Sequence, residues 1–512
     1  MQTTWSSQDQ AETVKILSSH QIRAVDAYTI EHEPISSIDL MERAAMACVD
    51  WFVHHFDTSR KIAIFAGYGN NGGDGLAIAR FLRLMRYDVS VFMLAGSDRL
   101  SPDALTNYQR LRDVRLLILT EKELPELHPS AIVIDALFGT GLSRPLGGLA
   151  AQTVAHINKS GCTIVSIDLP SGLFCEDNSK NNPENIIRAH HTLTFQQPKL
   201  SFLFSENADF VGSWEVLDIG LLPEAIEKQD SKYYLLPKQY NGNIPLRHKF
   251  AHKGDFGHAC LIAGSYGMMG ACVLAAKACL RAGAGLVTAH IPQRGNDIVQ
   301  ISVPEALVSL DDNSDVFSKL PDLNRYSAIG AGCGIGKRPE TQQALLALLN
   351  AMKGCSGKLV LDADALNILS ENRDWLKLLP PDSILTPHPK EFDRLAGVSE
   401  NGYQRHLKQI EMAQKYSVII VLKGAHTSIA APDGRCFFND TGNPGMATGG
   451  SGDVLTGIIT SLLAQGWQAF RAACTGVWLH GAAGDKAALK RGQQALIASD
   501  IIKNIRFETS DS

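Results

Sequence analysis

The segment at residues 67–75, GYGNNGGDG, places three polar side chains, Asn70, Asn71 and Asp74, among five glycines. Backbone amides at the start of a helix attract phosphate, and glycines let a ligand come close to the backbone. Glycine-rich turns also recur as purely structural elements, but such a turn does not require these three side chains together. The segment is therefore predicted to bind a ligand.

Two aspartates stand near the ends of apolar runs, Asp135 in VIDALFGTG and Asp168 in SIDLPSG. Each could cap a helix or occupy a solvated turn. Their repeated position favours a binding site instead, because open α/β sheets bind ligands at the carboxyl ends of their strands. Asn71, Asp135 and Ser171 offer only oxygen ligands, which suit a hard cation better than zinc.

A second glycine cluster, TGGSGDVLTG at residues 448–457, contains a single acid, Asp453. The amides of residues 449–452 could form an anion hole for a phosphoryl group in transfer, and Asp453 could accept a proton from the attacking hydroxyl. The alternative is that Asp453 only caps a helix.

Two further side chains, His388 in TPHPKE and Lys423 in VLKGAHT, favour the catalytic interpretation of this cluster. A lone histidine is more often structural, and a lone lysine is usually a solvated charge. Both residues, however, follow apolar runs that predict buried strands, which places them at the ligand-binding edge of a sheet.

The elements that must position these residues alternate between apolar strands and amphipathic helices. In the first half, strands are predicted at residues 61–67, 88–94, 131–136 and 162–168, and a helix at 76–87. In the second half, strands are predicted at 258–264, 327–332, 358–364, 382–387 and 417–424, and helices at 271–282 and 453–465. Strand, helix and parallel strand in succession form the βαβ unit, so both halves are predicted to be α/β domains.

The regular spacing of apolar residues that predicts strands and helices is lost at residues 221–247, where three prolines occur with charges of both signs. A chain of 512 residues is also too long for one hydrophobic core. We therefore expect two domains, at residues 1–230 and 231–512.

The bulk composition favours a cytoplasmic enzyme that acts on small molecules. With 48 basic and 53 acidic residues, the chain has no global positive field for nucleic acid or anionic lipid. The ten cysteines include no CxxC pair, so neither zinc nor disulfides are expected. Residues 1–10 lack the pattern of an export signal, and no apolar run is long enough to span a bilayer.

The motifs GNNGGDG, DALFGTGL, DLPSG and TLTFQQPKL resemble the epimerase family of the nicotinamide-nucleotide repair system, over roughly residues 15–220. The opening SSHQIRAVDAYTI is similar too. The resemblance implies a Rossmann-like three-layer domain, often in a homo-oligomer, that interconverts the R and S forms of NADHX and NADPHX. It implies a potassium site at Asn71, Asp135 and Ser171, and catalysis by Asp168, the group expected to take and return a proton. The implied substrate-binding residues are Asn70, Asn71, Gly72, Gly73, Asp74, Gly139, Thr140, Gly141, Leu142, Ser143, Arg144 and Asp168.

The second half resembles the NAD(P)H-hydrate dehydratase branch of the ribokinase-like fold, over roughly residues 235–505, through GSYGMMGA, GCGIG, DADALNIL, TPHPKEF, LKGAHT and GGSGDVLTG. One departure is Lys390, where many relatives have glycine, and it leaves the conformation of the loop beside His388 open. The implied hydrate-binding residues are Ala271, Gly334, His388 and Asp453, and the implied nucleotide-binding residues are Lys423, Gly424, Ala425, His426, Thr427 and Gly452.

The implied reaction moves the terminal phosphate of ADP or ATP, with Mg²⁺, onto the C6 hydroxyl of the S hydrate, after which the ring nitrogen expels phosphate and leaves NADH or NADPH. The sequence does not distinguish ADP from ATP as the phosphate donor, or NADHX from NADPHX as the substrate. A rival interpretation makes the second domain a kinase for a sugar or vitamin precursor and the first a non-catalytic Rossmann-like scaffold. Asn71, Asp135 and Asp168 favour an active first domain, because a scaffold has no need of these polar groups.

Overall fold

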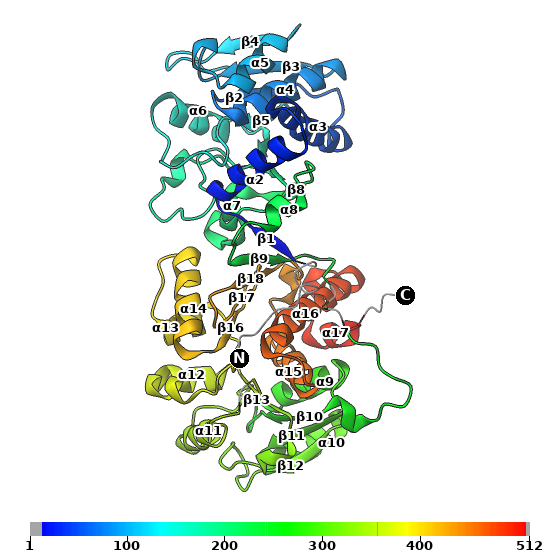
Figure 1. Cartoon of the computed structure of the whole chain (residues 1–512). Coiled ribbons are helices and arrows are strands. Elements are labelled where there is room, and N and C mark those ends of the chain that lie inside the picture. The colour runs from blue at the N-terminus through cyan, green and yellow to red at the C-terminus, as the bar shows by residue number, and fades with distance from the viewer. Residues whose placement is uncertain (1–12, 241, 243, 356, 508–512) are drawn as a thin grey trace. The chain divides into compact units, whose positions relative to one another are not determined.

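The computed structural model describes residues 13–240, 242, 244–355 and 357–507, which divide into two compact units (Figure 1). One unit is Lys15–Ser231, and the other is Lys232–Ser512 together with the residues up to Val14. The predictions for residues 1–10, and the outer ends of both predicted domains, lie outside the described residues. Among the helices of the described ranges, none is both long enough and apolar enough to cross a membrane.

The first unit is built on a seven-stranded sheet in which every neighbouring pair is parallel. Its strands, in spatial order, are β4 (Arg115–Ile118), β3 (Val89–Met93), β2 (Ile62–Ala66), β5 (Ile132–Ala136), β6 (Thr163–Ile167), β7 (His191–Phe195) and β8 (Ser213–Leu217). Its helices are α2 (Ser19–His32), α3 (Ser37–His55), α4 (Asn70–Leu84), α5 (Pro102–Arg110), α6 (Gly148–Lys159), α7 (Ala208–Val211) and α8 (Pro223–Glu227).

Side chains of the central strand β2 alternate between two cores, which gives this unit three layers. Ile62 and Ile64 pack with the apolar faces of α3 and α4. Ala63 and Phe65 point the other way and pack with α6. Since parallel strands covered on both faces are apolar throughout, the continuous apolar run at this strand is explained by its burial. The predicted three-layer α/β architecture is confirmed.

The second unit has a larger mixed sheet. The strand order is β1 (Val14–Ile16), β9 (Tyr233–Leu236), β18 (Cys436–Asn439), β17 (Ser428–Ala430), β16 (Ile419–Leu422), β15 (Ile384–Leu385), β14 (Leu359–Leu361), β13 (Ala328–Ala331), β10 (His258–Ile262), β11 (Leu286–Ile291) and β12 (Leu307–Leu310). Strand β17 runs antiparallel to both of its neighbours, and the pairs from β16 to β12 are parallel.

Helices cover both faces of this mixed sheet (Figure 1). One group packs on the largest buried apolar cluster and consists of α9 (Met269–Arg281), α15 (Ser451–Ala464), α16 (Ala469–Arg491) and α17 (Ala498–Asn504). The other group consists of α11 (Pro339–Ala351), α12 (Asp364–Glu371), α13 (Pro389–Ala396) and α14 (Gly402–Tyr416), and α10 (Asn296–Ser302) lies beside β12. The α/β class predicted for this half is confirmed as well.

All ten cysteines lie in the described ranges and have free thiols, and only Cys355 is not buried. Burial raises the pKa of several of these thiols, among them Cys260 and Cys272. The buried thiols therefore behave as small apolar core residues.

Candidate functional site

The first unit contains a cavity of about 510 Å³ above the carboxyl ends of β2, β5 and β6. These strands are neighbours in register, with Ala66 opposite Ala136 and Asp135 opposite Ser166, so the loops that follow them meet at one edge. The cavity is lined by most of the residues expected at the substrate: Asn70, Asn71, Asp74, Gly139, Thr140, Gly141, Leu142, Ser143, Arg144 and Asp168.

Two glycines expected at the substrate, Gly72 and Gly73, are buried and do not line this cavity. Helix α4 already begins at Asn70, so these glycines are helical, and the prediction that the helix begins only at residue 76 was wrong. A Cβ at Gly72 would lie 2.0 Å from the carbonyl oxygen of Gly67, and one at Gly73 would lie 2.7 Å from a methionine sulfur. Their absent side chains let α4 pack closely against its surroundings.

Asp135 and Ser171 form a buried pair behind the cavity. The Ser171 hydroxyl donates to Oδ1 of Asp135 at 2.5 Å, and its backbone N–H donates to Oδ2 at 2.9 Å. The Ser166 hydroxyl donates to the same Oδ2 at 2.8 Å. Burial raises the pKa of Asp135, and the hydrogen bonds from Ser171 and Ser166 oppose this shift.

The third residue of the expected cation site, Asn71, has a buried amide group whose oxygen and nitrogen both lack a hydrogen-bond partner in the described part of the chain. A buried amide without a partner is costly, and a cation would satisfy its oxygen. Carboxylate, hydroxyl and amide oxygens are ligands for a hard cation. In the described ranges no group of three or more His, Cys, Asp or Glu could hold a metal ion.

Asp168 is the first residue after β6 and has a backbone φ of +63°, a left-handed conformation that is uncommon for a residue other than glycine. Such strain is frequent at functional sites. Lys199, which is 1 % exposed, forms an ion pair with Oδ1 of Asp168 at 2.9 Å and donates to the carbonyl oxygen of Gln197 at 3.2 Å. A Cβ at Gly139 would lie 3.3 Å from Oδ2 of Asp168, so this second oxygen faces Gly139.

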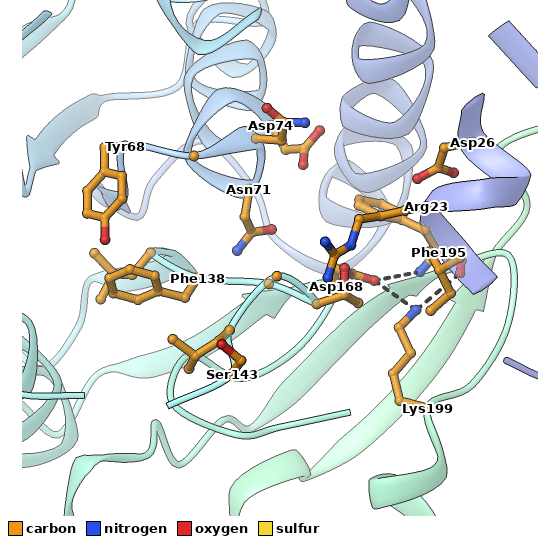
Figure 2. A pocket seen from close by; sticks show the side chains of 18 of the residues that line it. Arg23, Asp26, Tyr68, Asn71, Asp74, Phe138, Ser143, Asp168, Phe195 and Lys199 are labelled. Atoms are coloured by element: carbon orange, nitrogen blue, oxygen red, sulfur yellow. Dashed lines mark hydrogen bonds and ion pairs between the residues drawn. The ribbon is translucent and has the colours of Figure 1, made fainter. Parts of the chain in front are cut away.

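Two further acids share the cavity. Burial, together with the charge of Asp168, raises the pKa of Asp26 to about 6, although Lys199 opposes this shift. Burial and the charges of Asp168 and Asp26 raise the pKa of Asp74 well above its usual range. Figure 2 shows Asp26 and Arg23 on α2 and Asp74 on a different helix.

Sequence reasoning missed Arg23, Asp26 and Lys199 as lining residues of this cavity. Arg23 and Asp26 are three residues apart, so a helix puts both on one face. The signal was present, because both belong to SSHQIRAVDAYTI and Lys199 belongs to TLTFQQPKL, but nothing local distinguished them from surface charges.

The second unit contains a cavity of about 930 Å³ at the ends of β14, β15 and β16 and at the start of α15. It is lined by these predicted residues: His388, Lys423, Gly424, Ala425, Thr427, Gly452 and Asp453. Three predicted residues do not line it. Gly334 lies against Ala271, and Cys333 just before it hydrogen-bonds to Asp453, while His426 is 3.9 Å from the carboxylate of Asp440.

Helix α15 begins at Ser451 after its N-cap Gly450, so Asp453 is the third helical residue and makes no capping hydrogen bond. The capping interpretation of Asp453 was therefore wrong. Burial raises the pKa of Asp453 to about 6, while the Cys333 thiol opposes the shift. An acid that changes its charge near neutral pH is suited to proton transfer.

Lys423 lies beside the glycine cluster and is held by the buried Asp362. Its Nζ is 2.9 Å from Oδ1 of Asp362, whose Oδ2 accepts from Thr456 at 2.8 Å. A Cβ at Gly452 would lie 3.4 Å from Nζ, so the ammonium faces the start of α15. Burial lowers the pKa of Lys423, but the charges of Asp362 and Glu391 outweigh it and raise the pKa overall. Asp362 belongs to the motif DADALNIL, but the sequence did not predict that it would hold Lys423.

His388 is the N-cap of α13, where its Nδ1 accepts from the backbone N–H of Lys390 at 3.1 Å and of Glu391 at 3.3 Å. Lys390 is exposed and helical, a conformation that does not require glycine. The departure at Lys390 therefore leaves the backbone beside His388 intact. Burial lowers the pKa of His388.

Two family models match the chain. The NAD(P)H-hydrate dehydratase model matches residues 259–506, and the model for the YjeF-related protein N-terminus matches residues 37–201. The bifunctional NAD(P)H-hydrate repair enzyme of Moorella thermoacetica is 38% identical over 510 residues, with 95% of each chain covered. That of Thermofilum pendens is 36% identical over 502 residues, with 94% of each covered.

Among solved structures, the ADP/ATP-dependent NAD(P)H-hydrate dehydratase from Bacillus subtilis, co-crystallised with ATP and Mg²⁺, is 30% identical, with a TM-score of 0.45, and the match covers 53% of this chain and 95% of that one. The full-length relatives and the family models confirm the resemblance inferred from the motifs of both halves.

Proposed function

The chain belongs to the bifunctional NAD(P)H-hydrate repair enzymes, and from this premise we propose that its first unit epimerises NADHX and NADPHX and its second unit dehydrates the S epimer with ADP or ATP. An enzyme that accepts one epimer repairs only part of a mixed pool. An epimerase on the same chain makes the remainder available.

In the first cavity, Asp168 is proposed to exchange a proton with the C6 hydroxyl or with the water that replaces it. Its Oδ1 is held by Lys199, which leaves Oδ2 for the substrate. Asn70, Asn71, Asp74 and residues 139–144 are proposed to bind the dinucleotide hydrate, and the exposed side chains of Arg23 and Arg144 also line this cavity.

Asn71, Asp135 and Ser171 are proposed to hold K⁺. Support comes from the unsatisfied amide of Asn71 and from the oxygen atoms of the buried Asp135–Ser171 pair. The cation would supply a fixed positive charge beside the polar end of the substrate.

In the second cavity, Lys423, Gly424, Ala425, His426, Thr427 and Gly452 are proposed to bind the nucleotide, and Ala271, Gly334, His388 and Asp453 to contact the hydrate. Mg²⁺ would neutralise the phosphate oxygens during transfer. Asp453 is proposed to take the proton of the C6 hydroxyl as its oxygen attacks the terminal phosphorus. The amides at the start of α15 and the ammonium of Lys423 would stabilise the charge of the phosphoryl group.

Phosphorylation makes the C6 oxygen a good leaving group. The ring nitrogen can then form a double bond to C6 and expel phosphate, and loss of a ring proton gives NADH or NADPH. This sequence differs from that of an alcohol kinase, which leaves a stable phosphorylated product.

One observation carries the proposal: each of the two family models matches one compact unit, and each unit has its own cavity with a buried carboxyl group and an adjacent lysine. The test is recovery of NADH from a mixture of R and S hydrates. With ADP or ATP, the full chain should convert the whole mixture and release inorganic phosphate. Conversion of the S form alone would contradict the epimerase, and accumulation of a phosphorylated alcohol would favour a kinase.

A homo-oligomer in the cytoplasm is also proposed. The free, mostly buried thiols suit a reducing compartment, and light scattering would measure the oligomeric state.

A further inference from the structure

The first cavity contains two more carboxyl groups, those of Asp26 from α2 and Asp74 from α4. Neither has an acid–base role in the epimerisation proposed above. The interactions drawn in Figure 2 link Asp168, Lys199 and the backbone near Phe195, and none reaches Asp74. In the described residues, Asp74 has neither an ion pair nor a hydrogen bond, although it is only 9 % exposed.

The surroundings of Asp74 disfavour a charge on its carboxyl group. Burial is the largest cause of its raised pKa, and the carboxylates of Asp168, Asp26 and Asp103 add to it. The thiol of Cys48 on α3, which is also buried, interacts with Asp74 as well. A buried carboxyl group that has no ion pair and lies among other carboxylates favours its protonated form.

Epimerisation at C6 needs a proton donor as well as an acceptor. The hydroxyl is a poor leaving group unless it departs as water, and the water that adds to the other face must lose a proton. Asp168 suits the acceptor, because Lys199 holds its Oδ1 and its Oδ2 faces Gly139 and Asn71. The donor has to be a neutral acid in the same cavity.

We propose that Asp74 is this donor, and that it protonates the departing C6 hydroxyl while Asp168 receives the proton of the incoming water. This inference rests on the proposed epimerase function and adds a second catalytic residue to it. Asp26 is a weaker candidate, because it is less buried and the ammonium of Lys199 faces it and favours its charged form.

The C6–O bond breaks, its electrons leave with the oxygen, and the oxygen takes the proton of Asp74 to become water. The lone pair of N1 forms a double bond to C6. A water molecule then adds to the opposite face of C6, N1 regains its lone pair, and the water gives one proton to Asp168. Proton exchange with solvent restores Asp74 and Asp168 for the next turnover, and the reverse epimerisation uses the same groups with the roles exchanged.

The positions of the two carboxyl groups agree with one acting as proton donor and the other as proton acceptor. In Figure 2, Asp74 and Asn71 come from helix α4, whereas Asp168 comes from the end of a strand. A ring bound beside Gly139 and Asn71 would therefore have one carboxyl group on the helix side and the other on the sheet side.

The main test is the variant Asp74→Asn in the full chain. An amide resembles the neutral acid in shape and can keep its contacts, but it cannot donate a proton effectively. We expect kcat of epimerisation to fall about 10²- to 10⁴-fold, the usual contribution of a positioned acid, with KM and the dehydratase unchanged. The parent enzyme should also lose epimerase activity at alkaline pH, as Asp74 gives up its proton, and this limb should vanish in the variant.

The matched control is Asp103→Asn, which removes a half-buried carboxylate that acts on Asp74 from α5 without lining the cavity. It should epimerise at the parental rate at neutral pH. A folded Asp74→Asn protein with parental kcat would overturn the inference. An inactive parent would instead overturn the proposed epimerase function, so the two failures can be told apart.

A second measurement needs no variant. In water enriched in ¹⁸O, epimerisation by the parent should introduce one labelled oxygen at C6 per turnover, above the rate without enzyme. Retention of the original oxygen in every turnover would mean that the C6–O bond does not break, and would overturn the role of Asp74 as donor to a departing hydroxyl.

Discussion

The ammonium of Lys199 lies 2.9 Å from Oδ1 of Asp168, and the two side chains are 1 % and 12 % exposed. The pair joins the residue that follows β6 to the loop that follows β7. It fixes the orientation of the Asp168 carboxylate, so that one oxygen is engaged by the protein and the other faces the cavity.

Lys199→Met should weaken both stability and epimerisation. The variant leaves the enclosed carboxylate of Asp168 without its partner, which typically costs about 3–5 kcal/mol of unfolding free energy. Lys199→Arg should restore part of the activity. Denaturant unfolding and the epimerase assay measure these effects, with the exposed Lys180→Met as control. An unchanged kcat in Lys199→Met would contradict a positioning role for Lys199.

Exchange of K⁺ for a large organic cation should weaken the epimerase, because the site formed by Asn71, Asp135 and Ser171 would lose its cation. K⁺ should also raise the melting temperature of the parent, since a ligand that binds only the folded state stabilises it. Asp135→Ala should abolish that increase. Indifference of both the activity and the melting temperature to K⁺ would mean that no cation site exists there.

Asp453→Asn should lower dehydration by about 10²- to 10⁴-fold, because it removes the proton acceptor. Nucleotide binding through Lys423 and the epimerase should persist. The structure excludes the opposite expectation that Asn simply replaces Asp as a cap, because the N-cap of α15 is Gly450. Calorimetric titration with ADP and the dehydratase assay separate binding from catalysis, and a fully active variant would contradict the mechanism.

The pH dependence of dehydration should reveal the same group. Burial raises the pKa of Asp453 to about 6. Its carboxylate, the basic form, is therefore present above that pH and is lost as the pH falls through it. We expect kcat to decline below about pH 6 in the parent, and this acid limb to be absent from the residual activity of Asp453→Asn. A parental profile that stays flat to well below pH 6 would contradict this role.

A fragment that begins at Ser231 should convert the S hydrate with ADP and leave the R hydrate nearly untouched. The cut follows the division of the chain into two compact units between Ser231 and Lys232, and it leaves the whole dehydratase match, which begins at residue 259, in the fragment. Circular dichroism would verify folding. A well-folded fragment that has lost all activity would mean that the two halves share an active site.

The sequence by itself determined the α/β class of both halves and pointed to Asp168 and Asp453, because strand and helix periodicity and short glycine-rich motifs are local properties. It did not determine that Lys199 pairs with Asp168, that Asp26 shares a cavity with them, or that Asp362 holds Lys423. Gly72 and Gly73 also looked like ligand contacts, and the structure uses them to pack α4.

These relationships depend on which loops meet at the carboxyl edge of a parallel sheet, and therefore on the order and register of strands that are distant in sequence. The charge state of an acid depends in turn on its burial and its neighbours. Asp74 has the same local sequence whether it is solvated or enclosed, and only the tertiary structure decided that it is enclosed with Asp168 and Asp26 around it.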